Sequence, residues 1–311
     1  MTSAPSGTDR SASVGTGRSA PFGTVLTAMV TPFHPDGSVD LDGVQKVARH
    51  LVENGHDGLV VSGTTGESAT TTKEEDGEIL AAVRDAVGDR VRLVAGVGTN
   101  DTNTSLFLAR QAAKNGADGV LLVTPYYNKP GQRGVLHHFQ QVVEAAELPV
   151  MLYDVPGRTG TQIAYETYQV AAQWDPVVAV KDAVGDLARG LRLQDLGLAV
   201  YSGDDELNLA WLAHGAVGFV SVAGHVVGNE LREMHDVFAT DPTRARAVFA
   251  RILPAIEAIM GAPNYGATTA KAALELAGVL ESRRVRSPLV ELDDAELADL
   301  RAGLTAAGVL R

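Results

Sequence analysis

Short apolar runs alternate with amphipathic stretches along most of the chain. Eight runs rich in β-branched and other apolar residues stand at positions 24–31, 58–62, 91–96, 119–123, 150–153, 177–181, 199–202 and 217–222. Within these runs apolar residues mostly follow one another without regular polar alternation, which predicts strands that are buried on both faces of a sheet. Each run is followed by a polar or glycine-rich turn, and the repeated unit is therefore a strand, a turn and a helix.

Helical periodicity fills the segments between these strands. The predicted helices cover residues 41–54, 73–87, 104–115, 134–147 and 165–174, and shorter pieces follow. Thr72 and Glu75 have the spacing of a capping box at the start of the second helix. Gly116 stands where the third helix should stop, as expected of a C-terminal cap.

Eight alternating units of this kind predict a parallel sheet that closes into a (β/α)8 TIM barrel. A doubly wound open sheet is the alternative, and it is disfavoured because no G-x-G-x-x-G motif opens the first unit. Strand signals stop near Gly228, and helices broken at Pro254, Pro263 and Pro288 follow. We therefore expect a disordered Ser/Gly-rich tail (residues 1–20), a barrel (21–227) and a C-terminal helical extension packed on it (228–311).

Composition narrows the classes of function. The net charge of −12 and a pI near 5.1 argue against nucleic acid or an anionic membrane as partner, since both need a cationic surface. The chain has no cysteine, which excludes disulfides and thiolate nucleophiles. Its histidines have no metal-ligand spacing, and no run is apolar and long enough to span a membrane. We expect a cytoplasmic protein without a metal or another cofactor.

Lys181 is the most informative single residue. It ends the apolar run 177–181, whereas the other five lysines, including Lys271, stand in helical or loop sequence that we interpret as polar. An ammonium group in an apolar setting is poorly solvated, so its pKa falls and the neutral amine can attack a carbonyl group to form a Schiff base. The plain alternative is a lysine whose stem is buried and whose charge reaches water.

Other candidate residues also stand where apolar runs end, as the active site of a (β/α)8 barrel requires. The small residues at 63–67 could grip a carboxylate through side-chain and backbone donors, but they lack the Gly-Lys-Ser/Thr ending of a nucleotide-binding loop. Arg158 could clamp a second carboxylate. Each of these could instead be a turn, a packing residue or a surface charge. The candidates at strand ends are Thr64, Thr65, Tyr126, Tyr127, Tyr153, Arg158, Lys181 and Gly203.

Three motifs together carry a resemblance to a known family. Residues 63–68 (GTTGES), residues 153–159 (YDVPGRT) and Lys181, in this order and spacing, resemble the dihydrodipicolinate synthase / N-acetylneuraminate lyase family from about Pro21 to the chain end. The synthase branch fits better, because sialic acid lyases usually show Ser-Thr at Thr64-Thr65 and lack the arginine. The resemblance implies condensation of pyruvate with L-aspartate 4-semialdehyde in lysine and diaminopimelate biosynthesis.

The resemblance also implies roles for single residues and an assembly. It implies a Schiff base on Lys181 and a proton relay through Tyr153, Thr64 and Tyr127. It implies that Thr65 binds the pyruvate carboxylate and that Arg158 binds the semialdehyde. Backbone groups of Gly203 and Val220 would line the pocket. Tyr127 would reach the site of a neighbouring subunit. The expected assembly is a homotetramer made of two tight dimers.

Feedback by lysine is expected to be weak or absent. In family members inhibited by lysine, a histidine pair and a glutamate hold the inhibitor, and the matching residues here are Lys73, Asp76 and Thr104. Two other functions stay open from the sequence. One is a different Schiff-base lyase or dehydratase for a 2-oxo acid, of the N-acetylneuraminate lyase or 2-keto-3-deoxygluconate aldolase type. The other is a non-enzymatic sensor of a small oxo acid.

Overall fold

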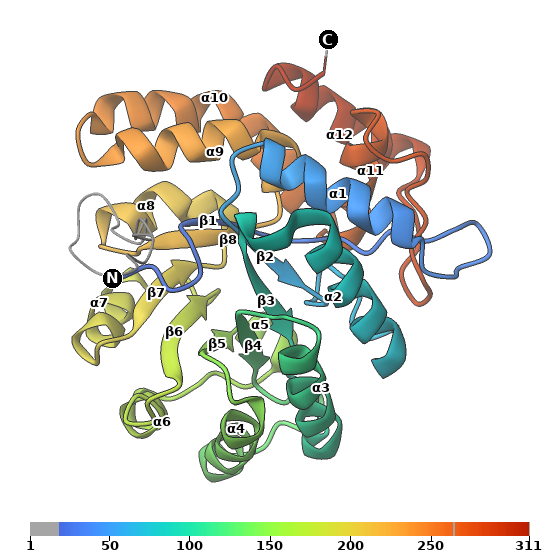
Figure 1. Ribbon diagram of the computed structural model, residues 1–311. Helices are drawn as coiled ribbons and strands as arrows, with labels where there is room; N and C mark the ends of the chain where they lie inside the picture. Colours follow the sequence, from blue (N-terminus) through green and yellow to red (C-terminus); the bar gives the residue numbers. More distant parts are fainter. Residues whose placement is uncertain (1–18, 264, 311) are drawn as a thin grey trace, which may run out of the picture.

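Eight parallel strands close into a barrel in the computed structural model, which describes residues 19–263 and 265–310 (Figure 1). The strands are β1 (Val25–Ala28), β2 (Gly58–Val61), β3 (Arg92–Gly96), β4 (Gly119–Val123), β5 (Val150–Asp154), β6 (Val177–Asp182), β7 (Ala199–Ser202) and β8 (Gly218–Ser221). Each strand pairs with its neighbours in the chain, and β8 pairs with β1 to close the sheet. The predicted fold class is confirmed.

Helices surround the barrel. They are α1 (Leu41–Glu53), α2 (Lys73–Val87), α3 (Thr102–Lys114), α4 (Gln132–Ala146), α5 (Pro156–Thr159), α6 (Tyr165–Ala171), α7 (Leu187–Asp195) and α8 (Asn208–Ala213), with 3-10 turns at Gly88–Arg90 and Asp205–Leu207. The predicted capping box of Thr72 and Glu75 is confirmed. Gly116 has the left-handed φ of 82° that suits a helix stop. The helix α3 begins at Thr102, two residues before its predicted start, because Asp101 caps it.

Four further helices form the C-terminal extension: α9 (Gly224–Phe238), α10 (Pro242–Met260), α11 (Ala267–Leu276) and α12 (Asp294–Ala306). In Figure 1, α9 and α10 lie side by side along one edge of the barrel, and α11 and α12 continue toward α1 and α2. The predicted break at Pro254 is wrong, because α10 runs through it while Ile252, Ala255 and Ile256 stay fully buried. Packing of that apolar face outweighs the backbone hydrogen bond that proline removes.

The predicted division of the chain falls inside an element. Residues 227 and 228 both lie in α9. Val227 forms a kink in this helix, because its φ of −124° and ψ of 27° are not helical. The division into barrel and extension therefore stays a prediction. The predicted disordered tail covers residues 1–20, of which residues 1–18 lie outside the described part of the chain.

An apolar core, distinct from the one between the sheet and the surrounding helices, fills the inside of the barrel. It includes Leu26, Val60, Met151, Ala179 and Val220, all at most 2% exposed. Side chains of a strand alternate between its two faces, so Tyr153 follows Met151 to the inside and Lys181 follows Ala179. Apolar residues fill the barrel below these two side chains. The phenol of Tyr153 and the amine of Lys181 therefore lie at the carboxyl ends of the strands, where a barrel forms its active site.

Candidate active site

Lys181 stands on β6 with its amine inside the mouth of the barrel. The residue is 5% exposed, and its Nζ lies 4.4 Å from the centroid of the Tyr153 ring on the neighbouring strand. The pKa of Lys181 is lowered to about 8, chiefly by burial; the carboxylate of Asp205 opposes this shift, and nearby Arg158 adds to it. About a tenth of this amine is therefore neutral and nucleophilic at pH 7, against less than about 0.1% of an ordinary lysine.

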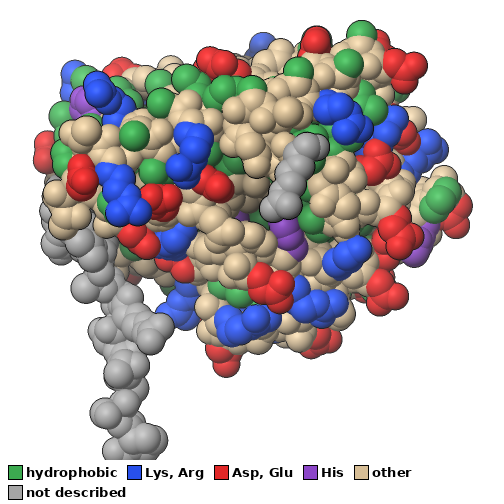
Figure 2. Space-filling model, turned by 90° about the horizontal axis from the view of Figure 1, so that it is seen from above, with side chains coloured by type: hydrophobic (Ala, Val, Ile, Leu, Met, Phe, Trp, Pro, Cys, Tyr) green, Lys and Arg blue, Asp and Glu red, His purple; other side chains and the backbone are tan. Residues whose placement is uncertain are grey.

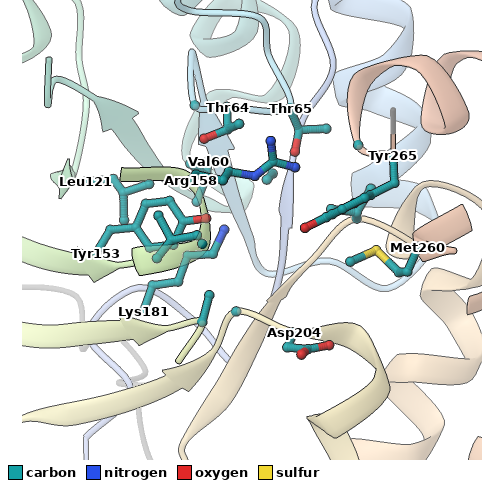
Figure 3. A pocket seen from close by; sticks show the side chains of 18 of the residues that line it. Val60, Thr64, Thr65, Leu121, Tyr153, Arg158, Lys181, Asp204, Met260 and Tyr265 are labelled. Carbon is teal, nitrogen blue, oxygen red and sulfur yellow. The ribbon is translucent and has the colours of Figure 1, made fainter. Parts of the chain in front are cut away.

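Tyr153 pairs in register with Lys181 across β5 and β6. Burial raises the pKa of its phenol to about 12, while the charge of Arg158 and a side-chain hydrogen bond with Thr64 act in the opposite direction. The hydroxyl is consequently protonated at neutral pH and stands beside both the amine and a threonine hydroxyl. In Figure 3 the Tyr153 and Lys181 side chains extend together toward Thr64 and Arg158.

The turn after β2 carries Thr64 and Thr65. Main-chain hydrogen bonds close it, from Glu67 N to Thr64 O at 3.1 Å and from Ser68 N to Gly63 O at 3.3 Å. Gly96 of β3 packs against this turn so closely that a Cβ there would lie 2.1 Å from Ser62 O. The threonine hydroxyls and main-chain groups of this turn therefore sit on a tightly supported backbone at the mouth of the barrel.

A cavity of about 500 Å³ joins these groups. Five predicted residues besides Lys181 line it: Thr64, Thr65, Tyr153, Arg158 and Gly203. Val220 does not, since its side chain belongs to the apolar core below. Tyr127 is 88% exposed and instead lines a second, more apolar cavity of about 360 Å³, which shares Thr64, Tyr153 and Arg158 with the first.

Two observations concern metals and membranes. Among residues 19–263 and 265–310, no group of three or more histidine, aspartate or glutamate side chains is placed to hold a metal ion. Within the same ranges, no helix has the length and apolar character needed to cross a bilayer. The expected independence from metals and other cofactors stays a prediction.

Comparison with known proteins identifies the family. The model of the dihydrodipicolinate synthetase family matches residues 21–307. The chain belongs to the dihydrodipicolinate synthetase family. It is an enzyme of this family, and the prediction made from its three motifs is confirmed.

Relatives in the family resemble the chain over nearly its whole length. The 4-hydroxy-tetrahydrodipicolinate synthase of Kineococcus radiotolerans is 55% identical over 93% of this chain and 94% of its own. The corresponding synthase 2 of Streptomyces coelicolor is 52% identical, with 93% and 96% covered. Among solved structures, the Cyanidioschyzon merolae enzyme with lysine bound superimposes with a TM-score of 0.89 at 40% identity, covering 93% of this chain and 99% of that one.

The family site contains residues that the sequence interpretation missed. Asp204, Met260 and Tyr265 line the large cavity, the last two from the C-terminal extension (Figure 3). The ring centroid of Tyr265 lies 4.8 Å from the Arg158 guanidinium carbon, a cation–π contact that restrains the arginine. Tyr265 belongs to the C-terminal extension and is far in sequence from any strand end. The expectation that site residues follow barrel strands therefore gave no signal for it.

A buried arginine ties together the strands that carry Tyr153 and Lys181. Asp154 and Asp182 directly follow these two residues and point to the opposite face of the sheet. Arg189 of α7 donates to Asp154 and, at 2.7 Å, to Asp182. Burial raises the pKa of both carboxyls, to about 6 for Asp154, against the effect of the guanidinium. The clamp fixes the ends of β5 and β6 relative to each other.

Proposed function

We propose that the chain condenses pyruvate with L-aspartate 4-semialdehyde to 4-hydroxy-tetrahydrodipicolinate, in lysine and diaminopimelate biosynthesis. The observation that carries the proposal is the buried, partly neutral amine of Lys181 beside the protonated phenol of Tyr153, in a chain 55% identical to a synthase of that name. A cytoplasmic location is part of the proposal. On the face shown in Figure 2 acidic and basic side chains are interspersed, which offers no basic patch there for nucleic acid.

In this reaction Lys181 is the nucleophile. Its neutral Nζ attacks the ketone carbon of pyruvate, and loss of water gives a Schiff base whose protonated form draws electrons from the neighbouring methyl group. Removal of a methyl proton gives an enamine, and its carbon attacks the aldehyde carbon to form the new carbon–carbon bond. Thr65 and the main chain of the turn hold the pyruvate carboxylate.

Tyr153 moves protons in these steps. Its hydroxyl is buried and close to the amine, and it shares a hydrogen bond with Thr64 that provides the next member of a relay. Arg158, held against Tyr265 at the cavity wall, offers a bidentate donor to the carboxylate of the semialdehyde. Gly203 offers its backbone groups to the cavity directly after β7, whereas Val220 of β8 does not line the cavity.

Tyr127 completes the relay from a second subunit in this proposal. It has a left-handed φ of 69° and an 88% exposed ring, so in the single chain it points its aromatic surface into solvent. The adjoining apolar cavity suits burial against a second copy, and two such dimers would form a homotetramer. Light scattering on the intact protein tests the assembly, and one solved relative described as a monomeric variant shows that the state must be measured.

The deciding experiment is turnover of pyruvate and L-aspartate 4-semialdehyde, coupled to dihydrodipicolinate reductase and followed as loss of NADPH. Robust turnover that depends on pyruvate supports the proposal. A folded protein that forms a borohydride-trapped adduct with pyruvate but does not use the semialdehyde would point to a lyase or dehydratase of another 2-oxo acid. A protein that forms no adduct would favour a sensor.

Weak feedback by lysine also stays a proposal. Lys73 opens α2 with its Nζ 4.9 Å from the Phe107 ring centroid, so a cation already stands at this position. Thr104 is bound to Asp101 at 2.6 Å and brings no charge of its own. A cationic effector would meet like charge from Lys73 and lack the glutamate partner. Strong inhibition in a kinetic titration with millimolar lysine would contradict this expectation.

A further inference from the structure

The turn that carries Thr64 and Thr65 has a strained backbone at both ends. Ser62 and Glu67 have φ angles of 53° and 58°, in the left-handed region that side-chain-bearing residues avoid. Such residues cost about 1–3 kcal/mol each and persist only where the surrounding structure holds them. Part of that support comes from the barrel itself, since Thr31 Oγ1, which follows β1, donates a hydrogen bond to Gly66 O at 2.8 Å.

The rest of the support comes from the C-terminal extension through the side chain of Glu67. This carboxylate is 1% exposed. Its Oε1 accepts a hydrogen bond from Lys271 Nζ at 2.5 Å, and its Oε2 accepts one from Arg286 N at 2.9 Å. Both carboxylate oxygens of Glu67 are therefore held by Lys271 and Arg286, two residues of the C-terminal extension.

Lys271 is fixed in its own right. It lies on α11 with 0% exposure, donates a second hydrogen bond to Arg284 O at 2.7 Å, and stands 4.0 Å from the centroid of the Phe33 ring. A lysine with these partners has little freedom to move. It therefore transmits the position of α11 to Glu67 and through Glu67 to the turn.

We propose that Lys271 is a positioning residue for pyruvate, which acts through Glu67 to hold the turn of residues 62–68 in the shape that receives the substrate carboxylate. This inference rests on the proposed function, since it assigns a substrate to the turn. It predicts that loss of the Lys271–Glu67 pair weakens pyruvate binding and leaves use of the semialdehyde nearly unchanged, because Arg158 stands on α5, outside this turn.

The test needs variants that do not leave a buried charge alone, since that would destabilise the fold. The double variant Glu67→Gln/Lys271→Met replaces the ion pair with neutral side chains of similar size. Glu67→Asp keeps the charge but shortens the side chain by one methylene, so the turn must shift for the carboxylate to reach Lys271. Glu75→Gln is the matched control, because it weakens another ion pair between the barrel and the extension, Glu75–Arg286 at 2.6 Å, whose arginine contacts Glu67 only through its main-chain N.

The readout is the pyruvate concentration that half-saturates formation of the borohydride-trapped adduct, measured without aldehyde. We expect a rise of roughly tenfold or more for the double variant and a smaller rise for Glu67→Asp, with the KM for semialdehyde within about twofold in both. Glu75→Gln should match the wild type. Half-saturation unchanged in a folded Glu67→Asp or double variant overturns the inference, as does an equal rise in both substrate constants. A wild type that traps no pyruvate overturns the proposed function instead.

Discussion

Two buried lysines near the same turn have similar pKa values and different surroundings. Burial lowers the pKa of Lys181 and of Lys271 to about 8, with Glu67 opposing the shift for Lys271. Lys271 Nζ has a carboxylate at 2.5 Å and a carbonyl at 2.7 Å and does not line the cavity. Lys181 lines the cavity, and its Nζ has no hydrogen-bond or ion-pair partner within the described residues.

The difference shows that a depressed pKa does not by itself identify a nucleophile. Desolvation lowers the pKa of any buried amine, whether the amine reacts or holds a structure together. A reactive amine also needs a free lone pair and room for a carbonyl carbon to approach. At Lys181 both conditions hold, and at Lys271 neither does. The predictions below contrast the two residues directly.

Matched substitutions should separate the two lysines most strongly in activity. Lys181→Met should fold and lose at least roughly 10³-fold in kcat, because no other amine can form the Schiff base. Lys271→Met, where it folds, should still yield the borohydride-trapped pyruvate adduct by mass spectrometry. Lys114→Ala, at an exposed position, is the control. An adduct that persists in Lys181→Met would remove this residue as the nucleophile.

The same pair should move stability in opposite directions. Lys271→Met leaves Glu67 buried without its cation and should lower the free energy of unfolding by about 3–5 kcal/mol. Lys181→Met removes a desolvated amine that has no hydrogen-bond or ion-pair partner within the described residues and should raise the free energy of unfolding by about 0.5–2 kcal/mol. Urea denaturation of both variants beside the wild type measures the effect. Shifts of the same sign would mean that the two amines are equivalent in the folded state.

Arg158→Ala should impair the use of the semialdehyde much more than the binding of pyruvate. We expect kcat/KM for the semialdehyde to fall roughly 10²-fold, since a charged bidentate contact is lost, while the adduct with pyruvate still forms. Arg158 also helps to lower the pKa of Lys181, so the variant should need a higher pH to form the adduct. Adduct formation at several pH values and semialdehyde kinetics supply the two measurements. Equal losses for both substrates would count against the role of Arg158 as aldehyde anchor.

The pH dependence of adduct formation should report Lys181 alone. Below a pKa of about 8 the neutral amine declines about tenfold per pH unit, so the rate at low pyruvate should rise with pH and level off above that value. The Glu67→Gln/Lys271→Met variant should keep the same midpoint, because its missing amine takes no part. A midpoint that moves in this variant would show that the two lysines titrate as one system.

The sequence predicted the barrel because each of its strands is a local apolar run, and it predicted Lys181, Tyr153 and Arg158 because strand ends are where barrels place reactive groups. It misread Lys271, which we had assigned to polar sequence and which is 0% exposed. Its burial depends on Glu67, which lies 204 residues earlier, and no local periodicity reveals such a pair. Arg189 escaped notice because one of its partners, Asp154, lies on another strand 35 residues earlier.

The long separation between Glu67 and Lys271 has a consequence for synthesis on the ribosome. Thr64, Tyr153 and Lys181 leave the ribosome well before α11, so the turn of residues 62–68 exists for a time without the cation that pairs with Glu67. A nascent chain that stops short of residue 271 contains all eight strands but lacks the cation that pairs with Glu67. We therefore expect enzymatic competence to arrive late in translation, with the C-terminal helices, although every proposed catalytic residue has already been made.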